Sequence, residues 1–348
     1  MPWQPLNKYC WDFWFVYKEH LHVFYLQATQ LACAYNAERR HNLSSVGHAV
    51  LTDFGWQEIS PSLPALSKRE GNYWDNISIW TGSIIEKEGR YYMFYTARCS
   101  EDQFVLTAHE RRQPQNIGVA ESSNLITWQR TTASKKHPVI PNPGPGSGFD
   151  GVSWRDPYVI KDDTDQQFYA FICACPIDAP TDAGGAVAYA TSLDLEDWQS
   201  QPYRILYKSP EFHYLEVPQV FWRKMPHQNC WRLYLVFSPY WNRFFERRDP
   251  RGTYYVRSLP IENRNVSYDC IPWEDEPANL LVDGVYGGKL VNPETKDTPA
   301  FFGFQLEDEA GHFVGGISDP LWAIFEQDGT IRLCNSQSLA TSPQAVSN

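Results

Sequence analysis

The stretch IGVAESSNLITW (residues 117–128) returns as VAYATSLDLEDW (187–198) and, in a shorter form, as VGHAVLTDFGW (46–56). Each copy is typical of a short strand, a turn containing Ser or Thr with Asn or Asp, and a closing tryptophan. The tryptophans stand at positions 56, 128 and 198, a period of about 70 residues. A regular return of this length indicates a protein built from repeated supersecondary units.

A second repeated unit accompanies these copies. It consists of an apolar strand, a polar turn and an aromatic strand, as in WTGSIIEKEGRYYMFY (80–95). Similar pairs begin at residues 12, 156 and 216, and a weaker pair begins at residue 284. The alternation of aromatic and β-branched residues favours β-hairpins, and no amphipathic helix of ten or more residues is predicted. Five such units of roughly 65–70 residues predict an all-β fold, a single five-bladed β-propeller.

The alternative architecture is a tandem of β-sandwiches, which would not explain the regular return of tryptophan. We expect one propeller domain over residues 1–335 and a frayed, flexible tail over residues 336–348. The Pro- and Gly-rich stretch at 138–148 keeps the phase of the repeat and is predicted to be a loop within the domain. The aromatic, polar segment at 241–249 follows the fourth unit, where it either borders the mouth of the propeller or is simply a solvated loop.

The composition narrows the classes of partner. The net charge of −11 over 348 residues includes no basic patch, so neither nucleic acid nor an anionic membrane is an expected partner. The 14 tryptophans suit a small saccharide partner, because an indole face can stack on a sugar ring as well as fill a core. Neither a secretory signal nor a membrane span is predicted. We therefore expect a cytoplasmic protein whose eight cysteines are reduced. The sequence gives no indication of the oligomeric state.

Three acidic residues occupy equivalent places in the repeat. Asp12, Asp156 and Glu216 each open the first strand of a unit, and that strand should be the innermost of its blade. Inner strands converge on the propeller axis, so we expect the three carboxylates to share one pocket. Taken singly, Asp12 could cap a strand end and Asp156 could form a local ion pair with Arg155, whereas Glu216 lies in the apolar context LEVP, where a charged residue needs a reason. Their equivalent positions favour a common function.

A cluster of carboxylates suits the hydrolysis of glycosides. This reaction needs one ionised carboxylate, acting as nucleophile or base, and one protonated carboxyl that acts as acid. Crowding of like charges raises the pKa of at least one member and so supplies the acid near neutral pH. The chemistry requires no cofactor, and no metal ligand set is predicted.

The motifs around these acids resemble those of the five-bladed furanosidases of glycoside hydrolase families 32, 43 and 68. The similarity extends over roughly residues 7 to 240 and is carried by six segments in order. These are WDFW (11–14), FYLQ (24–27), GHAV (47–50) followed by Asp53 and Trp56, WTGS (80–83), RDP (155–157) and EVP (216–218). The third segment with its Asp and Trp is similar to a family 32 motif, and RDP matches the family motif outright.

The resemblance implies a role for each acid. Asp12 would be the nucleophile, Glu216 the general acid/base and Asp156 the transition-state stabiliser of a retaining β-fructofuranosidase that hydrolyses or transfers fructosyl units from sucrose or a fructan. Arg155 would bind a sugar hydroxyl or orient a carboxylate. The remaining residues for which the resemblance implies substrate contacts are Trp11, Trp14, Gln27, Trp80, Ser83 and Trp154. His48 is an additional candidate, with a purely structural role as its alternative.

The sequence departs from family 32 in several places. It lacks the Asn-Asp-Pro-Asn motif and the Cys that follows the acid/base, and it has no segment that predicts the C-terminal β-sandwich usual in that family. Two other functions therefore stay open. One is an inverting arabinofuranosidase or xylosidase of the family 43 type, with Asp12 as general base. The other is a catalytically inactive sugar-binding propeller.

Overall fold

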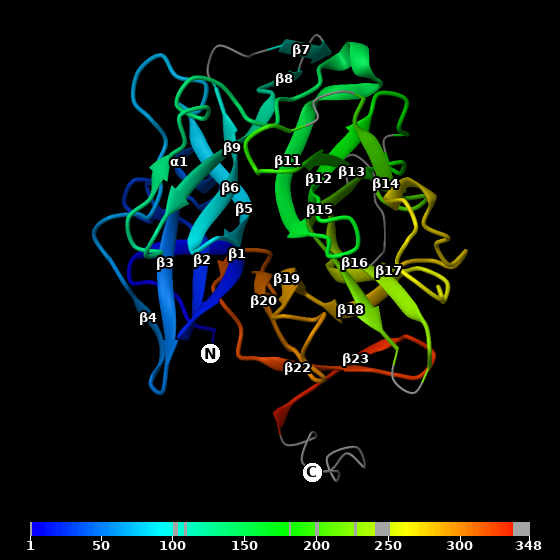
Figure 1. The fold of residues 1–348 in the computed structure, drawn as a ribbon. Coiled ribbons are helices and arrows are strands. Elements are labelled where there is room, and N and C mark those ends of the chain that lie inside the picture. Colours follow the sequence, from blue (N-terminus) through cyan, green and yellow to red (C-terminus); the bar gives the residue numbers. More distant parts are fainter. Residues whose placement is uncertain are drawn as a thin grey trace.

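Five four-stranded antiparallel blades surround a common axis in the computed structural model, which describes residues 2–99, 104–107, 110–180, 182–198, 202–225, 228–240 and 251–336 (Figure 1). Blade one contains β1 (Lys8–Lys18), β2 (His20–Thr29), β3 (Ser45–Thr52) and β4 (Gly55–Glu58). Blade two contains β5 (Ser78–Lys87), β6 (Arg90–Arg98), β9 (Gln115–Ser122) and β10 (Gln129–Arg130). Blade three contains β11 (Phe149–Lys161), β12 (Phe168–Pro176), β13 (Ala186–Ser192) and β14 (Arg204–Lys208).

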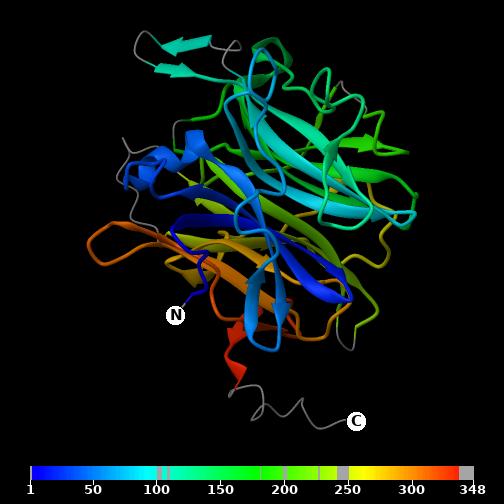
Figure 2. The ribbon, with the colours of Figure 1, turned by 90° about the vertical axis from the view of Figure 1, so that its left-hand side faces the viewer.

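Blades four and five repeat this order. Blade four contains β15 (Tyr214–Lys224), β16 (Trp231–Tyr240), β17 (Gly252–Arg257) and β18 (Asn279–Asp283). Blade five contains β19 (Val285–Leu290), β20 (Ala300–Glu307), β22 (Leu321–Phe325) and β23 (Ile331–Cys334), with β21 (Phe313–Gly315) paired to β20. The hairpin of β7 (Phe104–Thr107) and β8 (Glu110–Arg112) projects from the body of the propeller (Figure 2). The prediction of an all-β, five-bladed propeller is confirmed.

Helical structure is scarce in the described part of the chain. It consists of the one-turn helix α1 (Arg40–Leu43) and the 3-10 turns η1 (Ala37–Arg39), η2 (Pro145–Ser147) and η3 (Tyr268–Cys270). Among the described residues, no helix is long and apolar enough to cross a membrane. The predicted mouth loop at 241–249 and the predicted tail beyond residue 336 lie outside the described residues.

The repeated turn that reveals the blades has the same hydrogen bonds in blades two and three. The Ser122 hydroxyl accepts from the backbone N–H of Asn124 and Leu125, and the Trp128 indole donates to the Leu125 carbonyl at 3.0 Å. In blade three, Ser192, Asp194, Leu195 and Trp198 make the same contacts. Leu125 and Leu195 both have a positive φ, 66° and 74°. These local bonds explain why the Ser-Asx-Leu-Trp spacing recurs.

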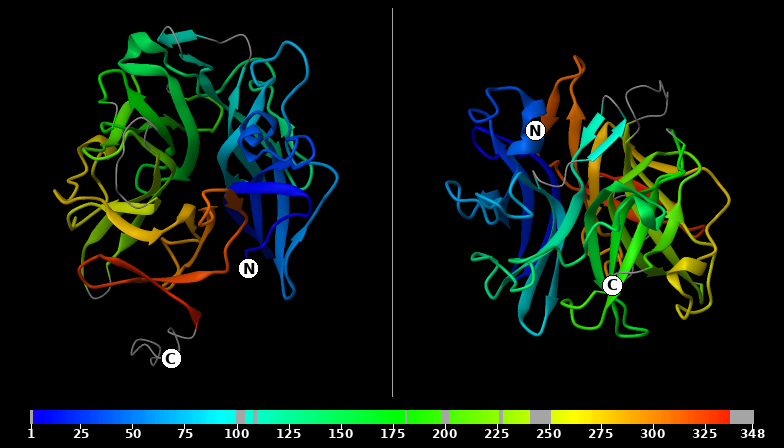
Figure 3. Two further views of the ribbon diagram at one scale, coloured as in Figure 1. Left: turned by 180° about the vertical axis from the view of Figure 1, so that it is seen from behind. Right: turned by 90° about the horizontal axis from the view of Figure 1, so that it is seen from above.

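The first strand of every unit lines the axis, as predicted. Views from the front and from behind show β1, β5, β11, β15 and β19 around the centre (Figures 1 and 3), and each of these strands contacts its neighbours in the ring. The ring closes between blades five and one. There Trp3 and Ile317 exchange two backbone hydrogen bonds of 2.8 Å, and the Gly316 N–H donates to the Cys10 carbonyl.

All five inner strands contain a register shift in their pairing with the second strand of the blade. The register shifts between Trp11 and Phe13 in β1, Trp80 and Gly82 in β5, Arg155 and Tyr158 in β11, Glu216 and Gln219 in β15, and Tyr286 and Lys289 in β19. A bulge re-aims a side chain without ending the strand. The acids were predicted to open their strands, and this is wrong in detail. They lie inside longer strands, at the bulges, because pairing resumes on both sides.

Candidate active site

Asp12 occupies the bulge of β1 and points to the axis. Its φ of 30° is unusual for a residue other than glycine, and the Thr81 hydroxyl from the bulge of β5 donates to its Oδ2. The pKa of Asp12 is raised to about 7, first by burial and then by the charges of Asp156 and Glu216, while the Thr81 hydrogen bond opposes the change. Burial and the negative charges of the other two acids therefore both disfavour the ionised form of the Asp12 carboxyl.

Asp156 lies deeper, at the bulge of β11, where it is almost fully buried. Its φ is 58°, and its Oδ2 accepts a 3.0 Å hydrogen bond from the Val217 N–H, next to Glu216. The pKa of Asp156 is raised to about 6, because burial and the charge of Glu216 raise it more than Arg155 lowers it. Asp156 therefore connects blades three and four directly through a charged hydrogen bond.

Glu216 is more accessible than Asp156, with 22% of its side chain exposed against 4%. Arg155 Nη2 lies 2.8 Å from its Oε1, and the Tyr286 hydroxyl from β19 donates to its Oε2 at 2.6 Å. The two carboxylate oxygens thus have different donors from different blades. The Arg155 guanidinium is itself fixed, since its Nη1 donates to Gln115 Oε1 and its plane lies 4.6 Å from the centre of the Tyr214 ring.

A chain of hydrogen bonds joins the acids around the axis. Asp12 accepts from Thr81, whose carbonyl accepts from the Thr96 hydroxyl at 2.9 Å. The same Thr96 oxygen accepts from the Asp156 N–H at 2.8 Å. Since Asp156 in turn holds Val217, the position of each acid depends on its neighbours, as a preorganised site requires. The structure therefore brings Asp12, Asp156, Glu216 and Arg155 together, as the sequence predicted.

Blade five contributes no acid but shapes the site closely. Gly287 has a φ of 63°, and a Cβ added there would lie 2.7 Å from the Phe304 ring and 3.4 Å from Asp12 Oδ1. Its N–H donates to the Ser238 hydroxyl at 2.9 Å. Tyr286 and Lys289 flank it, and neither was singled out from the sequence. The bulge of β19 carries no acid, so nothing in this weaker repeat marks it as part of the site.

Two of the predicted tryptophans lie beside Asp12 and its hydrogen-bond partner Thr81. Trp11 and Trp80 flank the ring of His41 in α1 with edge-on contacts of 6.0 and 6.1 Å, and the Trp80 indole donates to the His41 carbonyl at 2.7 Å. Trp80 is partly exposed, whereas Trp11 is buried under Arg40. Trp80 is thus the better placed of the two for contact with a ligand.

The structure places four other predicted residues inside the blades. Trp14 and Trp154 are buried in the cores of blades one and three, Trp154 without exposed surface and 4.6 Å from Tyr203. The ring of His48 stacks on Phe24 at 4.1 Å, two strands away from the axis, and the Ser83 hydroxyl accepts from the Val159 N–H at 3.0 Å. These contacts are structural and give no support to the predicted sugar contacts.

Gln27 is a different case. It lies in β2 opposite Cys10, and its side chain is buried. Its Oε1 has no hydrogen-bond partner among the described residues. Gly47 faces it, because a Cβ there would come within 2.8 Å of the same oxygen. The predicted contact between Gln27 and a sugar stays a prediction.

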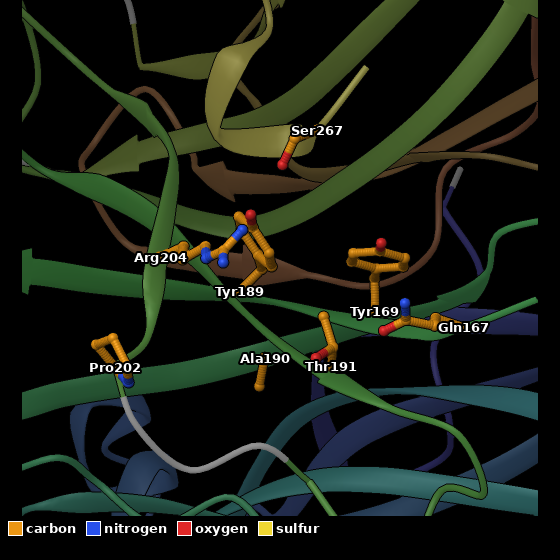
Figure 4. Close-up of a pocket in the computed structure, with 8 residues that line it drawn as sticks. All are labelled: Gln167, Tyr169, Tyr189, Ala190, Thr191, Pro202, Arg204 and Ser267. Carbon is orange, nitrogen blue, oxygen red and sulfur yellow. The ribbon is translucent and has the colours of Figure 1, made fainter. Parts of the chain in front are cut away.

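A separate pocket lies on blade three, away from the acids (Figure 4). Tyr169, which lines the pocket, pairs with Ile160 near the C-terminal end of β11. Asp156 lies earlier in the same strand, at the bulge. The pocket is lined by Gln167, Tyr169, Tyr189, Ala190, Thr191, Pro202, Arg204 and Ser267. Its polar groups are largely engaged already, as in the 2.5 Å bond from the Tyr169 hydroxyl to Asp165 and the Arg204–Asp269 ion pair. Among the described residues, no group of three or more His, Cys, Asp or Glu side chains is arranged to hold a metal ion.

The crowding of carboxylates predicts that the site lowers stability at neutral pH. The pKa of Asp12 is higher in the folded chain than in the unfolded chain, so stability is lost as the pH rises from about 4 to about 7. Asp12→Asn removes this charge and keeps an acceptor for Thr81. We expect it to raise Tm by about 2 °C or more at pH 8 and by less at pH 4, as measured by calorimetry. Asp163→Asn, at an exposed residue of the β11–β12 hairpin, is the control. A lower Tm for Asp12→Asn at pH 8 would contradict the expectation.

Comparison with known structures finds the same fold. A β-fructofuranosidase from Bombyx mori has a TM-score of 0.62 at 14% identity, over 96% of this chain and 66% of that one. An inulosucrase from Halalkalicoccus jeotgali bound to kestose has a TM-score of 0.64 at 17% identity, over 96% and 90% of the two chains. A sucrose-6-phosphate hydrolase from Lactobacillus gasseri has a TM-score of 0.66 at 15% identity, over 97% and 64%.

The chain spans about two thirds of the length of the Bombyx and Lactobacillus proteins. Comparison with curated protein sequences finds no match. The family model described as the glycosyl hydrolases family 32 N-terminal domain matches residues 12–276, from the first acid to just before β18 of blade four. This chain therefore belongs to glycosyl hydrolase family 32.

Proposed function

We propose that this chain is a retaining β-fructofuranosidase-like glycosidase that removes or transfers a terminal β-fructofuranosyl unit from sucrose or a fructan-type saccharide. The observation that carries the proposal is the meeting of Asp12, Asp156 and Glu216 at the bulges of three inner strands. Membership of family 32 supports it and favours fructosyl substrates over the arabinofuranosides of the family 43 alternative. The inulosucrase among the structures named above is bound to kestose, a fructosyl saccharide.

The proposed reaction has two steps. In the first, an Asp12 oxygen attacks the anomeric carbon while the Glu216 carboxyl gives its proton to the leaving oxygen. In the second, Glu216 takes a proton from water, or from an acceptor sugar hydroxyl, whose oxygen attacks the same carbon and releases Asp12. Asp156 would hold ring hydroxyls as positive charge develops. The hydrogen bonds of Arg155 and Tyr286 to Glu216 would keep its carboxyl oriented through both steps.

Incubation with sucrose and, separately, with 1-kestose tests the proposal. Hydrolysis of sucrose is expected to give equal glucose and fructose, and transfer to give more glucose than fructose together with longer saccharides. Asp12→Asn should release neither sugar, whereas the surface control Asp163→Asn should behave as the unmodified chain does. Binding of these sugars without turnover would favour the inactive sugar-binding alternative. Turnover of aryl arabinofuranosides with inversion would favour the family 43 type.

The proposal also predicts the pH dependence of the reaction. Asp12 must be ionised to attack, and its pKa is raised to about 7, so kcat/KM should fall as the pH drops below about 7. The pKa of Asp156 is raised to about 6, and since the two groups interact, the acid limb belongs to the pair. The measurement is kcat/KM on sucrose between pH 4 and 9 at constant ionic strength. Undiminished kcat/KM at pH 5 would contradict the expectation.

A further inference from the structure

Lys289 is a buried lysine on the blade-five strand β19, and it takes no part in the reaction proposed above. Only 4% of it is exposed. Its Nζ donates to the carbonyls of Val217 and Pro218, both at 2.8 Å, and lies 5.3 Å from the centre of the Tyr158 ring. Lysine is almost never buried unless its charge is matched. The groups around this ammonium therefore indicate what it does.

The two carbonyls belong to the peptide units that follow Glu216. Val217 has a φ of 52°, which is unusual for a β-branched residue, and its N–H is the donor to Asp156. This bulged segment is therefore held on both sides, by Asp156 at its N–H and by Lys289 at its carbonyls. A displacement of the segment would move the Glu216 carboxyl and break the hydrogen bond to Asp156 together.

The charge of Lys289 also faces the acids. Burial lowers the pKa of Lys289, the carboxylates of Asp156 from β11 and Asp12 from β1 oppose this change, and the net pKa is about 7. The other charged or titratable groups around these acids are Cys10 on β1, Arg155 and Tyr158 on β11, Cys173 on β12, Arg40 in α1, Glu216 on β15 and Tyr286 on β19. Arg155 lies 2.8 Å from Glu216 and 3.8 Å from Asp156, and Lys289 adds a second cation that approaches from blade five.

We propose that Lys289 is a positioning residue, whose ammonium fixes the Glu216–Pro218 bulge and places a positive charge beside Asp12 and Asp156. The inference rests on the proposed function where it concerns catalysis. Its structural half, the anchoring of the bulge, does not depend on the substrate. The two halves predict different measurable effects.

Lys289→Met removes the donors and the charge. We expect kcat on sucrose to fall about 100-fold with KM changed less than about threefold, because the acid/base is misplaced rather than the sugar unbound. The acid limb of kcat/KM should move to higher pH by about one unit, since the carboxyls lose a stabilising cation. Lys296→Met, at an exposed lysine of the β19–β20 connection, is the matched control and should change neither. A folded Lys289→Met variant with kcat within threefold and an unmoved acid limb would overturn the proposal.

Two further measurements separate the possible failures. Lys289→Gln keeps an N–H donor but removes the charge, so it tests the role of the charge even if the Met variant does not fold. It should shift the acid limb of kcat/KM. An unmoved acid limb would overturn the role of the charge. Crystal structures of the unmodified chain and of the folded variant test the anchoring without any substrate. We expect loss of the 2.8 Å Arg155–Glu216 contact in Lys289→Met. An unchanged bulge would overturn the anchoring, whereas inactivity of the unmodified chain on all fructosides would refute the proposed function alone.

Discussion

Asp12→Asn is expected to lower kcat/KM on sucrose by on the order of 10⁴-fold or more, the largest effect of any single change proposed for this chain. The amide cannot form the covalent bond to the anomeric carbon, yet it still accepts the Thr81 hydrogen bond. The fold should therefore persist. Initial rates of glucose release, measured at matched concentrations of folded protein, test the expectation.

The control for this change is Asp163→Asn, which makes the same chemical change at an exposed carboxylate in the turn between β11 and β12. It should leave kcat/KM within twofold. Retention of a tenth or more of the activity by Asp12→Asn would mean that another group attacks the sugar, and the assignment of the nucleophile would be wrong.

Glu216→Gln is expected to have the second largest effect, a loss of about 10²–10⁴-fold in kcat/KM on sucrose. The loss should be much smaller on an aryl β-fructofuranoside, because a phenolate-type leaving group needs little protonation. The second step still lacks its base, so a rapid release of the phenol should be followed by slow turnover. Stopped-flow absorbance on the aryl substrate and glucose release from sucrose provide the two measurements.

Glu196→Gln, at an exposed glutamate of the blade-three turn, is the matched control and should show neither effect. An equal loss of kcat/KM on both substrates would indicate that Glu216 acts in some way other than as a proton donor. Arg155 and Tyr286 donate to different oxygens of Glu216, and the amide of the Gln variant keeps only one of these oxygens. A modest increase in KM is therefore compatible with the assignment.

Much of the fold was predictable from the sequence because its determinants are local. The Ser-Asx-Leu-Trp turn is closed by hydrogen bonds among its own residues, so the same residue types recur at the same spacing in blades two and three. The inner strands could be aligned on these turns. Their radial arrangement then implied that Asp12, Asp156 and Glu216 approach one another, although neither their separation nor their hydrogen bonds could be read.

The bulges explain where prediction from the sequence failed. Simple alternation along β1 assigns neighbouring residues to opposite faces, but the bulge at Asp12 shifts the phase by one residue. Phe13 and Trp14 follow the bulge in regular pairing with β2, and both are buried, so Trp14 packs in the blade instead of facing a ligand. Along β11, Trp154 likewise packs into blade three beside Arg155, which faces the acids.

The individual hydrogen bonds between blades could not be predicted. Tyr286 and Lys289 reach Glu216 and its bulge from about 70 residues away in the sequence. Gly287 shows no motif, and its importance comes from the positive φ and the nearness of Asp12. Such residues become visible only when the ring is closed, since their partners lie on other blades.

The most direct test is to identify the covalent intermediate. Glu216→Gln should be mixed with an aryl β-fructofuranoside, quenched in acid during the slow phase, digested and analysed by mass spectrometry. The account predicts a fructosyl ester on the peptide that contains Asp12, and on no other peptide. A rapid release of phenol with an unmodified Asp12 peptide, or an adduct on a different residue, would contradict it.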